Sequence, residues 1–213
     1  MNKKHQVHNL IILDESGSMG SISKTIIQGF NEIVQTVKGI EKEYPEQEHF
    51  ISLVTFNGLG HKTLHFADPV SKLEMIDDSR YQPAASTPLY DAIGFSCTKL
   101  KSVLGNSTDY NVLVTILTDG EENASTEYNG PAVKRMIEEL KNHNWTFTYI
   151  GTDHDVEKSA MSISINNTIM FSKDEESMYS MFRKEKTARS NFSQNIREKN
   201  VTRDNFYKEG EKP

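Results

Sequence analysis

The stretch VHNLIILDESGSMG, residues 7–20, carries the pattern from which the fold can be predicted. Its first seven residues are mostly apolar, which is typical of a strand buried on both faces of a sheet. Asp14 ends this run, and serines and glycines follow it in a short polar loop. Over residues 21–40 apolar side chains then recur at helical spacing, with Gly39 as the expected stop. We therefore expect a strand, a tight loop and a helix.

The alternation of strand and helix continues along the chain. Two apolar runs at 50–56 and 62–66 flank a glycine turn and predict an antiparallel hairpin. Alternating strands and helices predict a mostly parallel sheet with helices on both faces, whose functional residues collect at the carboxyl ends of the strands. Asp14 and Asp119 both follow predicted strands. The remaining strands are expected at 112–117, 145–151 and 168–171, and the remaining helices at 69–80, 88–104, 131–142, 156–163 and 174–190.

The length and charge of the chain indicate one main domain and argue against nucleic acid as a partner. A chain of 213 residues can bury one α/β core with an appendage. We expect a domain at residues 1–171, and a C-terminal helix and polar tail at 172–213, with the helix packed on the domain. The first 171 residues hold 14 Lys and Arg against 22 Asp and Glu, a net charge of −8. Such acidity disfavours phosphate-backbone binding.

Cysteine content and hydropathy predict a cytoplasmic protein that is not inserted in a membrane. Cys97 is the only cysteine, so no intrachain disulfide can form, and it is expected to be a buried thiol. The apolar run at 10–13 is far shorter than a secretory or membrane-spanning segment.

The loop after the first strand has the composition of a cation site. Asp14, Ser16 and Ser18 alternate, so that one carboxylate and two hydroxyls can converge on one point. Oxygen ligands suit Mg2+, Ca2+ or Mn2+ and disfavour zinc. In isolation, however, the same residue types are also typical of a loop that caps a helix.

Three elements together resemble the von Willebrand factor A domain family. Asp14, Ser16 and Ser18 match its Asp-x-Ser-x-Ser motif, Thr87 resembles its threonine before a helix, and Asp119 resembles its acid after a central strand. The resemblance covers roughly residues 7–171 and is to the intracellular, bacterial type. It implies a doubly wound α/β fold: a mostly parallel six-stranded sheet with helices on both faces and one antiparallel edge strand.

The resemblance also implies a function. In this family the five positions form the metal-ion-dependent adhesion site, in which hydroxyls touch the metal and one or both aspartates act through water. We expect Mg2+, with Mn2+ or Ca2+ as alternatives, because few carboxylates are present and waters would remain on the ion. The ion would bind a carboxylate supplied by a partner protein. We expect a binding module rather than an enzyme; the oligomeric state is left open.

Two other functions stay open. An Asp at the end of a first parallel strand also occurs in Mg2+-dependent phosphatases and hydrolases, although their second Asp, two residues later, is replaced here by Ser16. A third possibility is a subunit of a larger assembly, because intracellular A-type domains of chelatase-like and tellurite-resistance-type stress systems are similar.

Several other residues have ordinary structural explanations. Asp91 either caps its helix or orients Thr87. The acids at 121, 122 and 153 are expected to be a solvated rim outside the metal shell. Met178, Met181 and Phe182 are expected to pack in the core, whereas Phe192, Ile196 and Phe206 would dock the tail onto its own domain or onto another protein.

Overall fold

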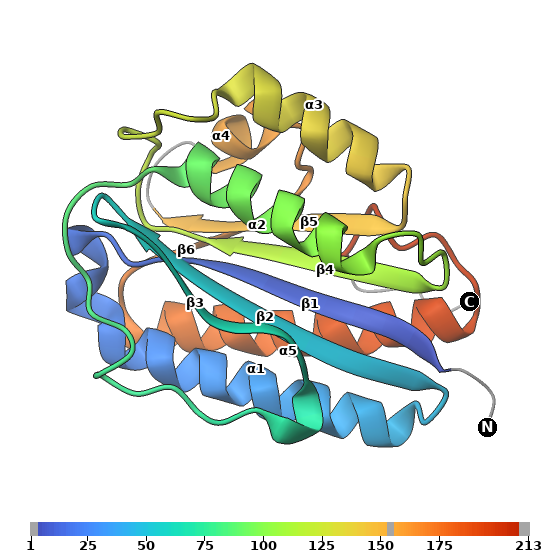
Figure 1. Cartoon of the computed structure of the whole chain (residues 1–213). Helices are drawn as coiled ribbons and strands as arrows, with labels where there is room; N and C mark the ends of the chain where they lie inside the picture. Colours follow the sequence, from blue (N-terminus) through green and yellow to red (C-terminus); the bar gives the residue numbers. More distant parts are fainter. Residues whose placement is uncertain (1–3, 153–155, 209–213) are drawn as a thin grey trace.

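A six-stranded sheet forms the centre of the computed structural model, which describes residues 4–152 and 156–208 (Figure 1). The strand order is β3-β2-β1-β4-β5-β6. Only the edge strand β3 is antiparallel to its neighbour, and all other pairs are parallel. The predicted fold class is thereby confirmed. The strands are β1 (His5–Asp14), β2 (Gln47–Asn57), β3 (Gly60–Pro69), β4 (Tyr110–Leu117), β5 (Trp145–Thr152) and β6 (Asn167–Phe171).

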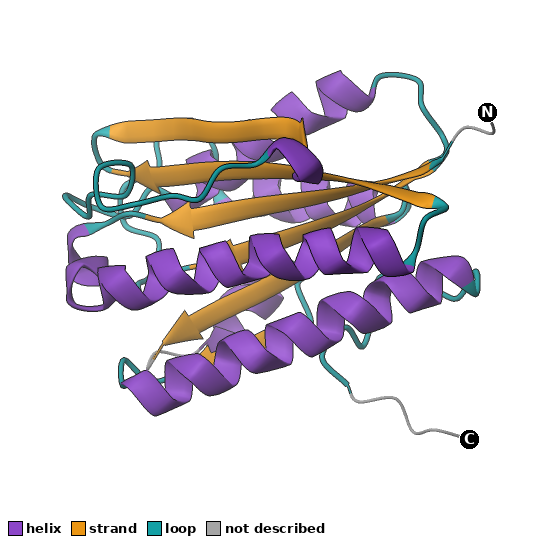
Figure 2. Ribbon diagram, turned by 90° about the horizontal axis from the view of Figure 1, so that it is seen from below, coloured by secondary structure: helices purple, strands orange, loops and turns teal. Residues whose placement is uncertain are grey.

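Helices cover both faces of the sheet (Figures 1 and 2). One face carries α2 (Leu89–Leu104), α3 (Gly130–Lys141) and α4 (Val156–Ser162), and the other carries α1 (Ser23–Glu43) and α5 (Glu175–Arg197). Two short 3-10 turns are η1 (Gly17–Ile22) and η2 (Val70–Lys72). Across the described ranges, no helix is long and apolar enough to span a bilayer.

The side-chain alternation of β1 explains why two cores form. Leu10 and Ile12 point to the core under α2 and α3, while Ile11 and Leu13 point to the core under α1 and α5. All four side chains are at most 3% exposed. Because successive strand residues face opposite sides, one apolar run supplies both layers.

Two helix predictions in the first 80 residues were wrong. Helix α1 passes Gly39 and ends at Glu43, because Pro45 disfavours the helical conformation of the residue before it. The expected helix at 69–80 is reduced to the single turn η2. Beyond this turn, the Asn31 side chain makes two hydrogen bonds of 3.0 Å to the backbone of Ile76, so the segment is held by α1 instead of by its own helical bonds.

Helix α5 runs seven residues beyond its predicted end and anchors the tail. Met178, Met181 and Phe182 are buried against α1 and the sheet, which confirms the packing prediction. Phe192 and Phe206 are also buried, with ring centroids 5.9 Å apart, so the tail docks onto its own domain. The division of the chain at residues 171 and 172 stays a prediction.

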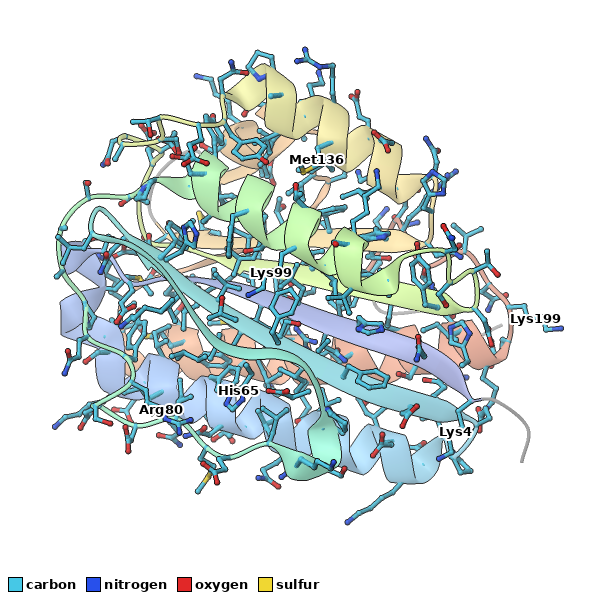
Figure 3. All side chains as sticks on the ribbon, in the orientation of Figure 1. Lys4, His65, Arg80, Lys99, Met136 and Lys199 are labelled. Atoms are coloured by element: carbon cyan, nitrogen blue, oxygen red, sulfur yellow. The ribbon has the colours of Figure 1, made fainter. Side chains whose placement is uncertain are left out.

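The exposed edge of the sheet is partly covered by side chains of α2. Lys99, labelled in Figure 3, lies with its ammonium 4.3 Å from the centroid of the Phe66 ring and 3.2 Å from the Thr63 hydroxyl, both on β3. Lysine at an edge strand disfavours pairing with other strands.

Candidate metal site

The ends of β1 and β4 bring the two motif aspartates to the same edge of the sheet. These strands are parallel neighbours, with Leu13 opposite Leu117. Asp14 and Thr118 therefore come next to each other, and Asp119 follows by one residue. The carboxyl end of a central parallel strand pair is the usual place for a ligand in an open α/β sheet.

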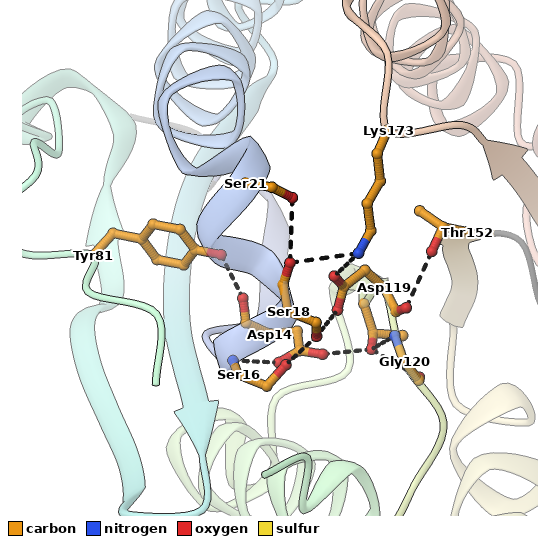
Figure 4. Close-up of polar contacts among 10 residues, drawn as sticks. Asp14, Ser16, Ser18, Ser21, Tyr81, Asp119, Gly120, Thr152 and Lys173 are labelled. Carbon is orange, nitrogen blue, oxygen red and sulfur yellow. Dashed lines mark hydrogen bonds and ion pairs between the residues drawn. The ribbon is translucent and has the colours of Figure 1, made fainter. Parts of the chain in front are cut away.

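A chain of hydrogen bonds links the motif side chains (Figure 4). The hydroxyl oxygens of Ser16 and Ser18 are 3.2 Å apart, and the Ser18 hydroxyl donates to Asp119 Oδ1 at 2.7 Å. Asp14 accepts from the Ser16 backbone N–H at 2.7 Å through Oδ1. Its Oδ2 accepts from the Thr118 hydroxyl at 2.6 Å. Four of the five predicted residues thus lie in one connected cluster.

The fifth predicted residue, Thr87, lies beside this cluster. A Cβ atom added to Gly120 would lie 3.6 Å from the Thr87 Oγ1, so the threonine side chain borders the loop that holds Asp119. Asn123 fixes the Thr87 backbone, because its Oδ1 accepts from the Thr87 N–H at 2.9 Å and its own N–H donates to the Thr87 carbonyl. All three predicted loops therefore meet at this edge of the sheet.

Glu15 is a positioning residue that sequence reasoning did not identify. Its carboxylate is fully buried and its Oε1 accepts from Lys62 Nζ and from the Gln82 N–H, both at 2.5 Å. Its carbonyl accepts from the Ala84 N–H at 2.9 Å. Glu15 therefore ties the first motif loop to the segment that leads to Thr87. No local signal marks it, because Lys62 lies 47 residues away.

The acids expected around the site have structural roles. Asp91 accepts from the backbone N–H groups of Thr126, Glu127 and Tyr128, so it holds that loop and does not orient Thr87 directly. Glu122 was expected to be solvated, but it accepts from the Tyr90 N–H at the start of α2 at 2.8 Å and from three donors within its own loop. Position 153 lies outside the described residues.

Burial of the two aspartates disfavours their charged forms unless a positive charge lies nearby. Burial raises the pKa of the Asp14 carboxyl, as does the nearby charge of Asp119, while the hydrogen bonds from Thr118 and Ser16 oppose the rise. The Lys173 ammonium lies 2.6 Å from Asp119 Oδ2. Within the described residues, Asp14 itself forms no ion pair with an ammonium group. One carboxylate charge is therefore left for a cation to neutralise.

The chemistry of the donors suits a hard divalent ion. Within the described part of the chain, no three His, Cys, Asp or Glu side chains lie close enough to hold a metal by themselves. A metal here would have to use hydroxyl oxygens as well as the two aspartates. Carboxylate and neutral oxygens suit Mg2+ better than zinc. The residues therefore fit the ion that the motif implies.

The sheet and this edge define the chain as a doubly wound α/β domain whose oxygen-rich loops meet at the carboxyl ends of β1 and β4. The family model of the von Willebrand factor type A domain matches residues 10–185, and the chain belongs to that family. Domains of this family are generally protein-interaction modules. No curated protein matches the chain in sequence.

Solved structures support the same fold. The chain is similar to the SpRpn10 VWA domain, with a TM-score of 0.56 and 12% identity over 84% of this chain and 94% of that one. It also resembles the pilus adhesin SpaC of Lactobacillus rhamnosus GG in an open conformation, with a TM-score of 0.62 and 12% identity over 88% of this chain and 30% of that one. Proximal thread matrix protein 1 of the mussel byssus has a TM-score of 0.55 and 12% identity over 87% of this chain, which spans 46% of that chain.

Proposed function

We propose that this domain is a metal-dependent protein-binding module. Asp14, Ser16, Ser18, Thr87 and Asp119 would hold one divalent cation, Mg2+ in preference to Mn2+ or Ca2+, and the cation would bind a carboxylate of a partner protein. The observation that carries the proposal is the hydrogen-bonded chain from Ser16 through Ser18 to Asp119, which joins two loops about a hundred residues apart in the sequence. A bound cation supplies a Lewis-acidic position for one outside oxygen.

The aspartates and the hydroxyl residues of the proposed site have different roles. Asp14 and Asp119 supply negative charge, and the hydroxyls of Ser16 and Ser18 add oxygen ligands without adding charge. A divalent ion held by two carboxylates stays attractive to one more anionic oxygen. Thr118 and Ser16 hold both oxygens of Asp14 in place, so the site is organised before an ion arrives. Specificity for the partner would come from the surrounding surface.

Calorimetry of the EDTA-treated protein tests the metal site. Mg2+ and Mn2+ should each bind at one site per chain, and Asp14→Ala should abolish binding. Asp78→Ala is the matched control, because it removes an exposed carboxylate away from the cluster. Equal binding by the wild type and both variants would exclude the proposed site.

A second measurement tests the carboxylate partner. Water exchanging on a protein-bound Mn2+ ion enhances the relaxation of water protons, so displacement of that water is directly observable. A glutamate-rich peptide should lower the enhancement, whereas a lysine-rich peptide of equal length should not. If both peptides have the same effect, a carboxylate does not complete the shell.

The alternative functions make different predictions. A Mg2+-dependent phosphatase would turn over a generic phosphate ester in an Asp14-dependent way, but the position for its second acid is Ser16, whose hydroxyl lies 3.2 Å from that of Ser18. A subunit of a stress-response or chelatase-like assembly would co-purify with its partner in Mg2+ and lose it in EDTA. A cytoplasmic location stays a prediction.

A further inference from the structure

Lys173 reaches the candidate metal site from a distant part of the chain. It lies in the turn between β6 and α5, and Figure 4 shows its side chain directed at Asp119. The ammonium is 2.6 Å from Asp119 Oδ2 and 3.4 Å from the carbonyl oxygen of Ser18. The Asp119 side chain is fully buried in this arrangement, while the Lys173 side chain is 32% exposed. A positive charge therefore already lies at the edge of the cluster.

The geometry of this contact allows another cation to replace the Lys173 ammonium at Asp119. Asp119 Oδ1 is used by the Ser18 hydroxyl, whereas Oδ2 has no donor in hydrogen-bonding geometry among the described residues. The ammonium is thus held at Oδ2 as an ion pair. Lysine is a compact charge on a flexible stem, and its partly exposed side chain can turn towards water without disturbing the core. Ser16, Ser18 and Thr118 would keep their positions if it did.

We propose that Lys173 is an internal cation of this site, which neutralises Asp119 when no divalent ion is bound and competes with the ion for that carboxylate. The inference rests on the proposed metal site and adds a residue that no motif element includes. An arriving ion must either displace the ammonium from Asp119 or bind beside a like charge, and both weaken its binding. Lys173 therefore raises the metal concentration at which the site fills.

Removing the charge tests the inference. Lys173→Met should bind Mn2+ at least tenfold more tightly than the wild type, as measured by the electron paramagnetic resonance of the free aqueous ion. A tenfold change corresponds to about 1.4 kcal/mol. In EDTA the same variant should have a lower Tm than the wild type, because Asp119 loses its counter-charge. Mg2+ should raise the Tm of the variant more than that of the wild type.

Two control variants separate this role from general effects. Lys173→Arg keeps the charge and should bind Mn2+ with nearly the wild-type Kd. Lys24→Met removes an equal charge from the exposed start of α1 and should also leave the Kd unchanged. If Lys173→Met fails to fold, as judged by circular dichroism, Lys173→Gln replaces it in the same titration.

The outcomes distinguish the two proposals. If the wild type and Lys173→Met bind Mn2+ with the same Kd, the metal site stands and the competing role of Lys173 is overturned. Weaker binding by Lys173→Met overturns it as well, since the ammonium would then assist the ion. If neither protein nor the Lys24→Met control binds Mn2+, the proposed function itself fails, and this inference fails with it.

Discussion

The hydroxyl of Thr118 donates a hydrogen bond of 2.6 Å to Asp14 Oδ2, and this bond joins the ends of two neighbouring strands beneath the candidate site. Thr118 is fully buried and also accepts from the Gly120 N–H at 3.2 Å. The residue lies outside the motif, but it fixes one of the motif carboxylates. Its hydroxyl is therefore expected to affect both stability and metal binding.

Thr118→Val should remove this bond with little change of shape. We expect a loss of about 1–3 kcal/mol in the free energy of unfolding, because a buried carboxylate oxygen loses its donor. Mn2+ affinity should fall as well. Thr118→Ser, which keeps the hydroxyl, is the control. Urea unfolding and an Mn2+ titration measure both effects, and a Val variant as stable as the wild type would contradict the expectation.

The buried ion pair of α5 should be strongly coupled in a double-mutant cycle. Arg189 lies 2.8 Å from Glu185 Oε1 and donates to Asn9 Oδ1 at 2.8 Å and to the Thr115 hydroxyl at 2.7 Å. Arg189→Met should cost about 3–5 kcal/mol, because it leaves a buried carboxylate without its counter-charge.

A second substitution removes the Glu185 charge that Arg189→Met leaves unpaired. Glu185→Gln combined with Arg189→Met should recover part of that loss, as measured by chemical denaturation at constant pH. Strictly additive single-variant effects would show that the two side chains do not stabilise each other.

Acid should destabilise the domain through a buried histidine. Burial lowers the pKa of His8 to about 4, and neither ring nitrogen of His8 has a hydrogen-bond partner in the described structure. The unfolded chain, with a histidine pKa of about 6.5, binds the proton more readily than the folded chain. This contribution to stability is therefore complete above about pH 6.5 and is lost as the pH falls towards 4.

The magnitude of this loss can be measured with one substitution. A shift of this size corresponds to roughly 3 kcal/mol of stability between the two pH values. His8→Phe, which keeps a ring stacked on Phe50, should reduce the dependence between pH 6.5 and 4, and the part that remains belongs to His49, whose pKa burial lowers to about 3. His143→Phe, at an exposed position, is the control and should follow the wild type. Parallel pH curves for the wild type and His8→Phe would refute the assignment.

Two glycines of α1 should respond in opposite directions to the same substitution. A Cβ atom at Gly29 would lie 2.0 Å from the ring of Phe182 on α5, whereas at Gly39 it would have no neighbour within 4 Å. Gly29→Ala should destabilise by about 1–3 kcal/mol through overpacking. Gly39→Ala should stabilise by about 0.5–1 kcal/mol, because alanine is the better helix former. Thermal unfolding distinguishes them, and equal shifts of Tm would contradict this packing.

The local pattern of apolar and polar residues was sufficient to predict the fold, but it did not predict many of the contacts between distant residues. The apolar runs that became β1 and β4 were predictable because burial on both faces favours nearly continuous apolar residues. The expected helix at 69–80 failed because its hydrogen bonds come from Asn31, a residue about 45 positions away that no window of sequence includes. The length of α5 was underestimated because its last turns are held by distant residues: Gln47 donates to the Ser193 carbonyl, and Arg197 pairs with Glu46.

The sequence by itself determined the alternation of strands and helices and the types of oxygen donor at the ends of β1 and β4, because periodicity and residue chemistry are local properties. It did not reveal the contacts by which Glu15 and Asn123 position the motif loops, or the contact of Lys173 with Asp119. Only the tertiary structure decided these contacts. Lys173 meets Asp119 because the strand order of the sheet brings the turn before α5 close to the end of β4. Contacts between residues far apart in the chain depend on how the layers pack, and no single segment encodes that packing.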